Sequence, residues 1–462
     1  MNIFSSYRRA RTVYRLSRGV NNFLGAPWAG GVVLLVCVVI AMLLANLPWT
    51  AHLYHEVLET KLELWISNHD TSVNWLFPSD MTVEKFVNDI LMVIFFFTVG
   101  LEIKRELVCG QLSSVKRAIL PVVAAAGGML APALIYLCFN FGTGAMNGWG
   151  IPTATDIAFA IGILSILGDR VPVSLKVFLT ALAIADDLGA ILVIALFYGG
   201  QVQFLYLLLA IVIMVFVYLM GRAGEKRMFC YFVPSVLVWV LFYYSGIHST
   251  LSGVAMAMLI PMKPRYNKSG FLRKVRHLYG RIEEMAASDG VFTEEELHES
   301  LRHLGQLSTR SAAMSERLEH VLNPYVTFLI MPIFALANAG VEITSAEYLN
   351  IFHYTPELGS IGMGVFFGLL LGKPVGIFAA SYCAVKCHLA EIPQGGTWKM
   401  LFAVACLGGI GFTMSIFVDS LAFPAGNELI DRGKIAILMG SFAAAVLGCI
   451  LILLLTAKKK QA

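Results

Sequence analysis

Charged side chains are scarce in this sequence of 462 residues. Asp, Glu, Lys and Arg make up 14% of it, against about a quarter of an average soluble domain. Hydrophobic residues make up 58%, and they fall in runs of roughly 20 residues, the length that a helix needs to cross the hydrocarbon core of a bilayer. The net charge of +4 is too small to indicate a nucleic-acid partner. The composition therefore predicts an integral membrane protein that contacts lipid.

The cysteines give no sign of a disulfide framework or a metal site. Five of the 8 cysteines lie in apolar runs, and their spacing fits neither a disulfide framework nor a paired zinc motif. Cys383 and Cys387 are one helical turn apart, but no second pair of ligands follows them. We therefore expect no bound cofactor, and we expect no enzymatic reaction.

The apolar runs predict an all-α polytopic membrane protein with about 12 transmembrane helices. The expected spans are 28–47, 86–103, 118–139, 149–167, 172–199, 203–220, 228–244, 247–262, 322–339, 358–383, 401–418 and 433–456. Lys and Arg gather in alternate connections, whereas the connections 140–147, 198–203 and 341–357 contain neither. The positive-inside rule then places both termini in the cytoplasm and requires an even number of spans.

The chain divides by composition into five segments. We expect a cytoplasmic N-terminal segment (1–27), a first membrane part (28–262, spans one to eight), a cytoplasmic connection (263–318), a second membrane part (319–457, spans nine to twelve) and a basic tail (458–462). Within the connection, Thr293 to Glu296 form a capping-box pattern. That pattern predicts an amphipathic helix near 294–304.

Two of the expected spans are interrupted by helix-breaking residues. Span four contains Gly148-Trp149-Gly150-Ile151-Pro152-Thr153-Ala154-Thr155-Asp156, and span eleven contains Gly408-Gly409-Ile410-Gly411-Phe412-Thr413-Met414-Ser415. Each is the middle span of a triplet, three to five and ten to twelve. Interrupted spans at matching positions predict inverted repeats with crossing broken helices and an ion site near the middle of the membrane.

Asp186 and Asp187 are adjacent acids in the middle of apolar span five. An ionised carboxylate there costs several kcal/mol unless it is paired, hydrated or protonated. Consecutive helix residues point about 100° apart, so one acid can face a cavity while the other reaches a neighbouring helix. A carboxylate that carries either a proton or a cation meets the chemical requirement for exchange. The alternative is a purely structural acid pair that a lysine neutralises.

Other charged residues near the membrane have more than one interpretation. Lys373 can pair with Asp186 inside the protein or extend its ammonium to the interface, and Asp156 can compensate the positive ends of broken helices. Asp89, Glu102 and Glu319 lie near span ends, where they can respond to pH or serve as ordinary solvated termini. His248 can titrate near neutral pH or cap the helix that follows it.

Seven segments together resemble the NhaA-type sodium/proton antiporters of bacterial inner membranes. They are NDILMVIFFFTVGLEIKRE (88–106), IPTATDIAFAIGIL (151–164), LTALAIADDLGAILVIALFY (179–198), GIHSTLSGV (246–254), FALANAGV (334–341), GLLLGKPVG (368–376) and GGIGFTMSIF (408–417). Inverted repeats with paired broken helices are a known feature of this family, so the repeat and the resemblance are not independent inferences.

The resemblance implies roles for individual residues. Asp187 and Asp186 are the cation- and proton-binding pair, and Lys373 is the partner of Asp186. Thr155 and Asp156 belong to the unwound stretch near the ion. Asp89, Glu102, His248 and Glu319 match positions that the family links to its pH response. The family further implies electrogenic exchange of internal sodium or lithium for external protons, a role in pH and sodium homeostasis, and a homodimer in the lipid bilayer.

The sequence departs from the family pattern in three places. The connection 263–318 is long, Asn323-Pro324-Tyr325 replaces a His-Pro-Trp pattern, and Asp419 stands where a neutral residue is expected. These differences concern pH dependence more than transport. Two other functions are weighed against antiport. An intramembrane aspartyl protease needs its acids on separate helices, one in a Gly-x-Gly-Asp setting that this sequence lacks, and a sodium-coupled solute symporter would take up sodium without exchanging protons.

Overall fold

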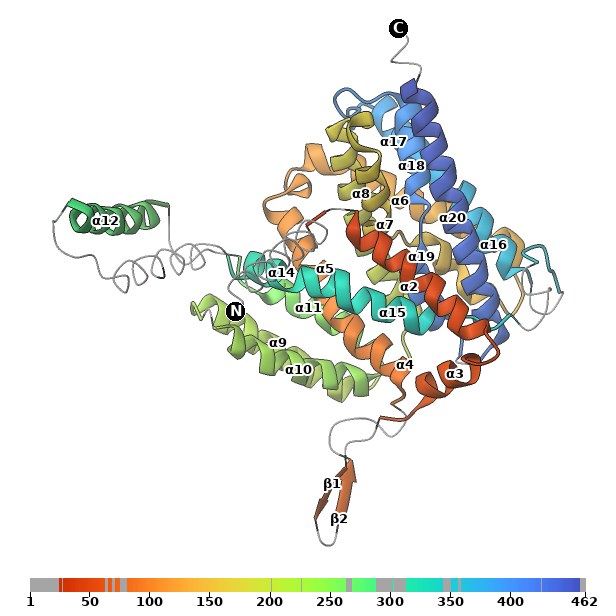
Figure 1. Ribbon diagram of the computed structural model, residues 1–462, viewed down its shortest axis with the longest axis horizontal. Coiled ribbons are helices and arrows are strands. Elements are labelled where there is room, and N and C mark those ends of the chain that lie inside the picture. The colour runs from red at the N-terminus through yellow and green to blue at the C-terminus, as the bar shows by residue number, and fades with distance from the viewer. Residues whose placement is uncertain are drawn as a thin grey trace, which may run out of the picture. The chain divides into compact units, whose positions relative to one another are not determined.

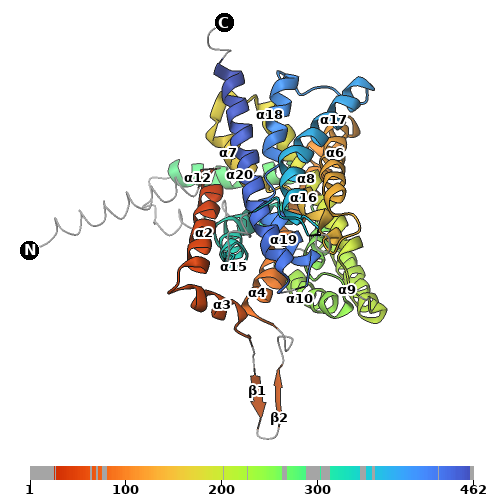
Figure 2. The same ribbon diagram turned by 90° about the vertical axis from the view of Figure 1, so that its right-hand side faces the viewer.

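Where the computed structural model describes the chain, its regular elements are helices and one short hairpin (Figures 1 and 2). It describes residues 25–26, 28–62, 65–68, 71–74, 81–200, 202–225, 227–262, 268–287, 302, 313–343, 350–355, 359–424 and 426–457. The described chain forms two compact units. Unit 1 draws on Met1–Phe95, Glu106–Gly200 and Val326–Ala462, and unit 2 on Phe96–Arg105 and Gln201–Tyr325. Helix α5 (Met92–Val108) contributes residues to both.

The other elements of unit 1 come from the two ends of the chain. The N-terminal elements are α2 (Ala29–Asn46), α3 (Ala51–Glu59), β1 (Trp65–Asn68), β2 (Thr71–Asn74), α4 (Val83–Phe86), η1 (Val87–Leu91), η2 (Gln111–Ser113), α6 (Val115–Asn140), η3 (Met146–Thr153), α7 (Ile157–Ile166), η4 (Gly168–Arg170) and α8 (Val173–Phe197). The C-terminal elements are η5 (Val326–Ile330), α15 (Met331–Asn338), α16 (Ile361–Phe367), η7 (Gly368–Gly372), α17 (Lys373–Lys386), α18 (Trp398–Gly408), α19 (Phe412–Ala422) and α20 (Glu428–Ala457).

The predicted multi-pass helical architecture is confirmed, with a difference in the number of full-length spans. The described residues contain 10 helices that are long and apolar enough to cross a membrane, or up to 11 when α18 and α19 count as one bent span. The remaining prediction, span 247–262, is the short helix α11 (Thr250–Leu259). Its 10 residues rise only about 15 Å, half the hydrocarbon thickness.

The hairpin β1–β2 is the exception to the predicted all-α fold. Its strands pair antiparallel, with Trp65 opposite Asn74 and Asn68 opposite Thr71. Figures 1 and 2 both show it extending away from the helices on either side. It lies in the connection 48–85, between the first two expected spans. The helix predicted at 294–304 falls almost wholly outside the described residues, so that prediction stays open.

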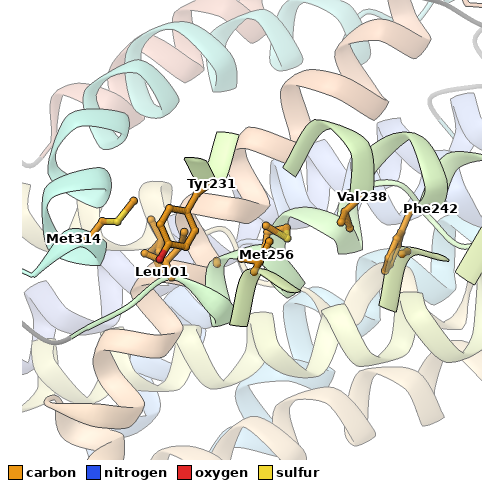
Figure 3. Close-up of a cluster of buried hydrophobic side chains, with 10 residues drawn as sticks. Leu101, Tyr231, Val238, Phe242, Met256 and Met314 are labelled. Carbon is orange, nitrogen blue, oxygen red and sulfur yellow. The ribbon is translucent and has the colours of Figure 1, made fainter. Parts of the chain in front are cut away.

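Unit 2 has its own apolar core (Figure 3). Besides the α5 segment, it contains α9 (Phe204–Arg222), α10 (Met228–Ser245), α11, α12 (Lys268–Ala287) and α14 (Met314–Tyr325). Leu101, Tyr231, Val238 and Met256 meet in this core. Lys104 donates a hydrogen bond of 2.7 Å to the carbonyl of Met258, which places a cation at the C-terminal end of α11, where the helix dipole is negative.

Helices α6 and α17 approach closely in unit 1, and this contact places Lys373. A Cβ atom at Gly127 would lie 2.5 Å from the carbonyl oxygen of Gly376, so only glycine fits there. Small residues allow membrane helices to approach in this way. The contact holds the start of α17, and with it Lys373, against the middle of unit 1.

Candidate ion-binding site

Both predicted breaks are present in the structure. In the first, the 3-10 helix η3 ends at Thr153, residues 154–156 are not helical, and α7 begins at Ile157. Pro152 lacks the backbone N–H that a regular helix needs. In the second, α18 ends at Gly408 and α19 begins at Phe412, with 48° between the two helices.

Hydrogen bonds join the two breaks to each other. The backbone N–H of Asp156 donates to the carbonyl of Ile410 over 2.7 Å, and the hydroxyl of Thr155 lies 3.0 Å from the carbonyl oxygen of Gly408. These groups would otherwise be unsatisfied where the helices are interrupted. The two unwound segments therefore cross and satisfy one another within unit 1.

Asp156 lies at the N-termini of two half-helices. Its Oδ1 accepts from the backbone N–H of Phe159 over 3.1 Å, which caps α7. Its Oδ2 accepts from the backbone N–H of Thr413 over 3.3 Å and from the Thr413 hydroxyl at the start of α19. The side chain is buried. A carboxylate is favoured where two helices present their positive ends.

The acid pair lies in the middle of α8. Asp186 and Asp187 are each only 2% exposed. Lys373 Nζ donates to Asp186 Oδ2 over 2.6 Å and to the carbonyl of Thr153 over 2.5 Å. The Thr155 hydroxyl lies 2.6 Å from the same Asp186 oxygen. Asp186 Oδ1, in contrast, accepts no hydrogen bond from the described part of the chain.

Lys373 is an interior residue. Its side chain is 1% exposed, so the alternative in which its ammonium reaches the interface is wrong in this structure. It follows the π-helical turn η7, a distortion that often occurs at functional sites. The ammonium interacts electrostatically with Asp187 as well as with Asp186. Two carboxylates and one ammonium therefore share a desolvated region.

The four residues expected to respond to pH are divided between the two units. Glu319 is buried and accepts from Arg105 over 2.6 Å. The same arginine lies 3.8 Å from Glu102. His248 lies just before α11 in the same unit, whereas Asp89 lies on η1 in unit 1.

Sequence reasoning missed the polar partners of the second break. Thr413 binds Asp156, and the Ser415 hydroxyl donates to the carbonyl of Ile151 over 2.7 Å. The Ser441 hydroxyl accepts from the backbone N–H of Phe412 over 3.1 Å. Thr413 and Ser415 stand in the glycine-rich motif of span eleven, so the signal was present. Ser441 lies in an apolar helix and offered no comparable signal.

This arrangement defines a class of protein: a multi-pass helical membrane protein with a desolvated charged site at crossing broken helices, the architecture of ion-coupled transporters. The family model described as Na+/H+ antiporter 1 matches residues 21–452. The chain belongs to this Na+/H+ antiporter family, as the seven sequence segments indicated.

Curated relatives of similar length agree. The Na(+)/H(+) antiporter NhaA of Sulfurimonas denitrificans is 40% identical over 97% of this chain and 98% of its own length. The Na(+)/H(+) antiporter NhaA of Bacteroides thetaiotaomicron is 40% identical over 96% of this chain and 99% of its own. The Na(+)/H(+) antiporter NhaA of Shewanella amazonensis is 42% identical over 94% of this chain and 96% of its own length.

Proposed function

We propose that this protein is an electrogenic sodium/proton antiporter that extrudes Na+ or Li+ in exchange for external protons. The observation that carries the proposal is the buried group formed by Asp186, Asp187 and Lys373 beside the crossing. Family membership supports sodium and protons as the exchanged ions. Both are transported substrates, and the site chemistry requires no resident cofactor. The resulting physiological role is sodium and pH homeostasis.

The carboxylates supply the charge that replaces the hydration shell of the cation. A desolvated Na+ needs several oxygen ligands in place of water. We assign the acidic ligands to Asp187 and Asp186, with the Thr155 hydroxyl beside them and Asp156 holding the two half-helices at the crossing. One Asp186 oxygen is already engaged by Lys373, so a cation that binds Asp186 competes with the ammonium for negative charge.

This competition supports electrogenic exchange. If Na+ displaced a single proton from a single carboxyl group, exchange would move no net charge. The site contains three ionisable groups within mutual electrostatic reach, so binding of one Na+ can release more than one proton. Lys373 provides the additional proton when the cation enters.

The pH response is assigned to the ion-pair network of unit 2 and to Asp89. Glu102 and Glu319 share Arg105, so protonation of either acid changes the charge that the arginine must balance. His248 adds a histidine, the side-chain type whose ordinary pKa is nearest to neutral pH. Asp89 lies on the π-helical turn η1, where irregular backbone can adjust to a change in charge.

We place the protein in the bacterial inner membrane with both termini in the cytoplasm. The support is the distribution of Lys and Arg across alternate connections together with the family. Helices such as α9 expose many of their large apolar side chains, as a lipid-facing helix does. A homodimer is the assembly that the family resemblance implies.

Exchange by purified protein in proteoliposomes tests the proposal. With a pH-sensitive dye inside, sodium or lithium gradients should drive proton movement, potassium gradients should not, and collapse of the membrane potential should change the rate. Asp187→Asn should abolish sodium-driven proton flux, because it removes charge that replaces lost hydration. Asp169→Asn, at an exposed acid in η4, is the matched control. Sodium uptake that requires an added solute and moves no protons would instead establish a sodium-coupled symporter.

A further inference from the structure

A second desolvated carboxylate lies outside the candidate site. Asp419 in α19 is 0% exposed, and neither of its carboxylate oxygens has a hydrogen-bond partner within the described residues. Nearly all buried polar groups in proteins have a partner, so each exception needs an explanation. Asp419 is also the acid that departs from the family pattern.

Its position separates it from the crossing. Asp419 lies seven residues after Phe412 in α19, which places it about 10 Å further along the helix axis. Helix α19 runs away from the connection that carries Lys386 and Lys399. In the proposed topology, this direction leads from the middle of the membrane toward the outside.

The backbone of α20 leaves room for this carboxylate. A Cβ atom at Gly433 would lie closer than 3.0 Å to both oxygens of Asp419, so the carboxylate rests directly against the helix. The next residue, Lys434, is only 7% exposed and attracts Asp419 electrostatically, while Asp431 repels it. No ion pair shorter than 4.0 Å joins Asp419 to Lys434 within the described chain.

The tyrosines that face Asp419 do not neutralise it. Tyr136 and Tyr198 also interact with it electrostatically. The Tyr136 hydroxyl donates to the carbonyl of Ala145 over 2.7 Å, and the Tyr198 hydroxyl donates to that of Asn147 over 2.8 Å. Two other elements that pack on α19, η3 and α15, carry no ionisable side chain, and Asp156 contacts α19 at its start, through Thr413.

Titratable groups lead from this carboxylate to exposed residues of unit 1. Asp431 interacts electrostatically with Lys434, His55 and Glu342. His55 Nε2 lies 3.9 Å from Glu342 Oε2, and their side chains are 39% and 56% exposed. Protons can therefore bind to His55 or Glu342 at the exposed end of this series of residues, and to Asp419 at its buried end.

We propose that Asp419 is a second proton-binding site, which takes protons from the outer side on their way to the acid pair, with Lys434 as its counter-charge. This inference rests on the proposed antiport. A proton fits better than a second Na+, because Asp419 is a single carboxylate beside a lysine, and no cluster of three or more acidic, His or Cys side chains surrounds it in the described chain. Protonation removes the charge of a buried carboxylate that no donor contacts in the described chain, and with it the cost of burying that charge.

Infrared difference spectroscopy and transport test this site separately. The wild-type protein should show a protonated carboxyl band that titrates with pH and is absent in Asp419→Asn. In oriented proteoliposomes at fixed internal pH, each proton that must bind changes the rate by up to about tenfold per external pH unit. In Asp419→Asn the rate should depend less steeply on external pH, by the contribution of one proton. The internal Na+ concentration that gives the half-maximal rate should change less than twofold. Asp169→Asn should preserve the band and the dependence.

The variant Asp419→Asn/Lys434→Gln distinguishes proton binding from structural charge compensation. If Asp419 only neutralises Lys434, the double variant restores both thermal stability and the external pH profile, and the proposal is wrong. If it binds protons, stability returns but the lost pH dependence does not. An unchanged pH profile in Asp419→Asn also overturns it. Absence of exchange in the wild-type protein would refute the antiport instead, and the infrared band would still report on Asp419.

Discussion

Replacement of Asp186 by Asn tests whether the buried ion pair is as charged as its geometry indicates. Asp186 and Lys373 have side chains that are 2% and 1% exposed, and their charged atoms are 2.6 Å apart. Asn preserves the size of the side chain and can still accept a hydrogen bond. It removes the negative charge that Lys373 contacts directly, so the ammonium keeps the Thr153 carbonyl, an amide oxygen and its weaker attraction to Asp187.

The expected loss of stability is large. Breaking a buried ion pair by removing one partner costs about 3–5 kcal/mol, because the other charge stays buried without compensation. At about 1.4 kcal/mol per factor of ten, this range is a factor of roughly 150 to 4,000 in the unfolding equilibrium. The double variant Asp186→Asn/Lys373→Met removes both charges and should recover most of the loss.

The assay is the thermal unfolding of purified protein in detergent, with inactivation half-lives at one temperature where unfolding is irreversible. Asp169→Asn controls for loss of an exposed acid. Lys386→Ala, at an exposed residue, controls for Lys373→Ala, which should impair stability or coupling far more. A wild-type melting curve for Asp186→Asn, or a double variant less stable than either single variant, would refute the buried charge pair. Sodium-driven proton flux should be absent in Asp186→Asn whatever the stability of this variant.

Three further outcomes follow from the same structure. The apparent sodium affinity of the wild-type protein should weaken as pH falls, by up to about tenfold per pH unit for one competing proton, and a pH-independent isotherm by calorimetry would contradict competition. Glu319→Gln should cost at most about 1 kcal/mol in thermal unfolding, because the charge left behind is that of Arg105, whose side chain is 39% exposed against 11% for Glu319 and can be hydrated; a larger loss would show that water does not screen the arginine. Replacement of 266–312 by a Gly/Ser linker should keep sodium/proton exchange and shift its pH profile, whereas loss of exchange in a folded, membrane-inserted variant would make the connection part of the transport machinery.

The membrane-spanning fold was predictable because lipid imposes strong constraints on sequence. Continuous apolar runs reveal helices, and Gly and Pro inside such runs reveal where they break. The hairpin β1–β2 was not predictable, because its strands have four residues each and follow no apolar alternation. The short α11 was overestimated, because apolar residues on both sides of it extend the hydropathy signal beyond the helix.

The candidate site was predictable where rare residue types carried the signal. An acid or a lysine inside an apolar run is conspicuous, so Asp186, Asp187 and Lys373 stood out individually. The pairing of Lys373 with Asp186 was one of two interpretations of the lysine and was implied by the family resemblance. The apolar pattern alone could not decide it, because it does not show which helices pack together. Thr413 is the clearest omission: threonine is common in membrane helices, and only the three-dimensional crossing brings it to Asp156.

Thr155 links the acid pair to the crossing through a single hydroxyl proton. Its oxygen lies 2.6 Å from Asp186 Oδ2 and 3.0 Å from the carbonyl of Gly408, but one hydroxyl proton cannot serve two acceptors fully. When a cation occupies Asp186, the proton becomes available to Gly408, so occupancy alters a bond across the two breaks. Thr155→Val keeps the shape and leaves the backbone bond from Asp156 to Ile410. It should therefore slow exchange more than it lowers stability, and equal losses in both, measured by vesicle fluorescence and thermal unfolding, would show that the hydroxyl is only structural.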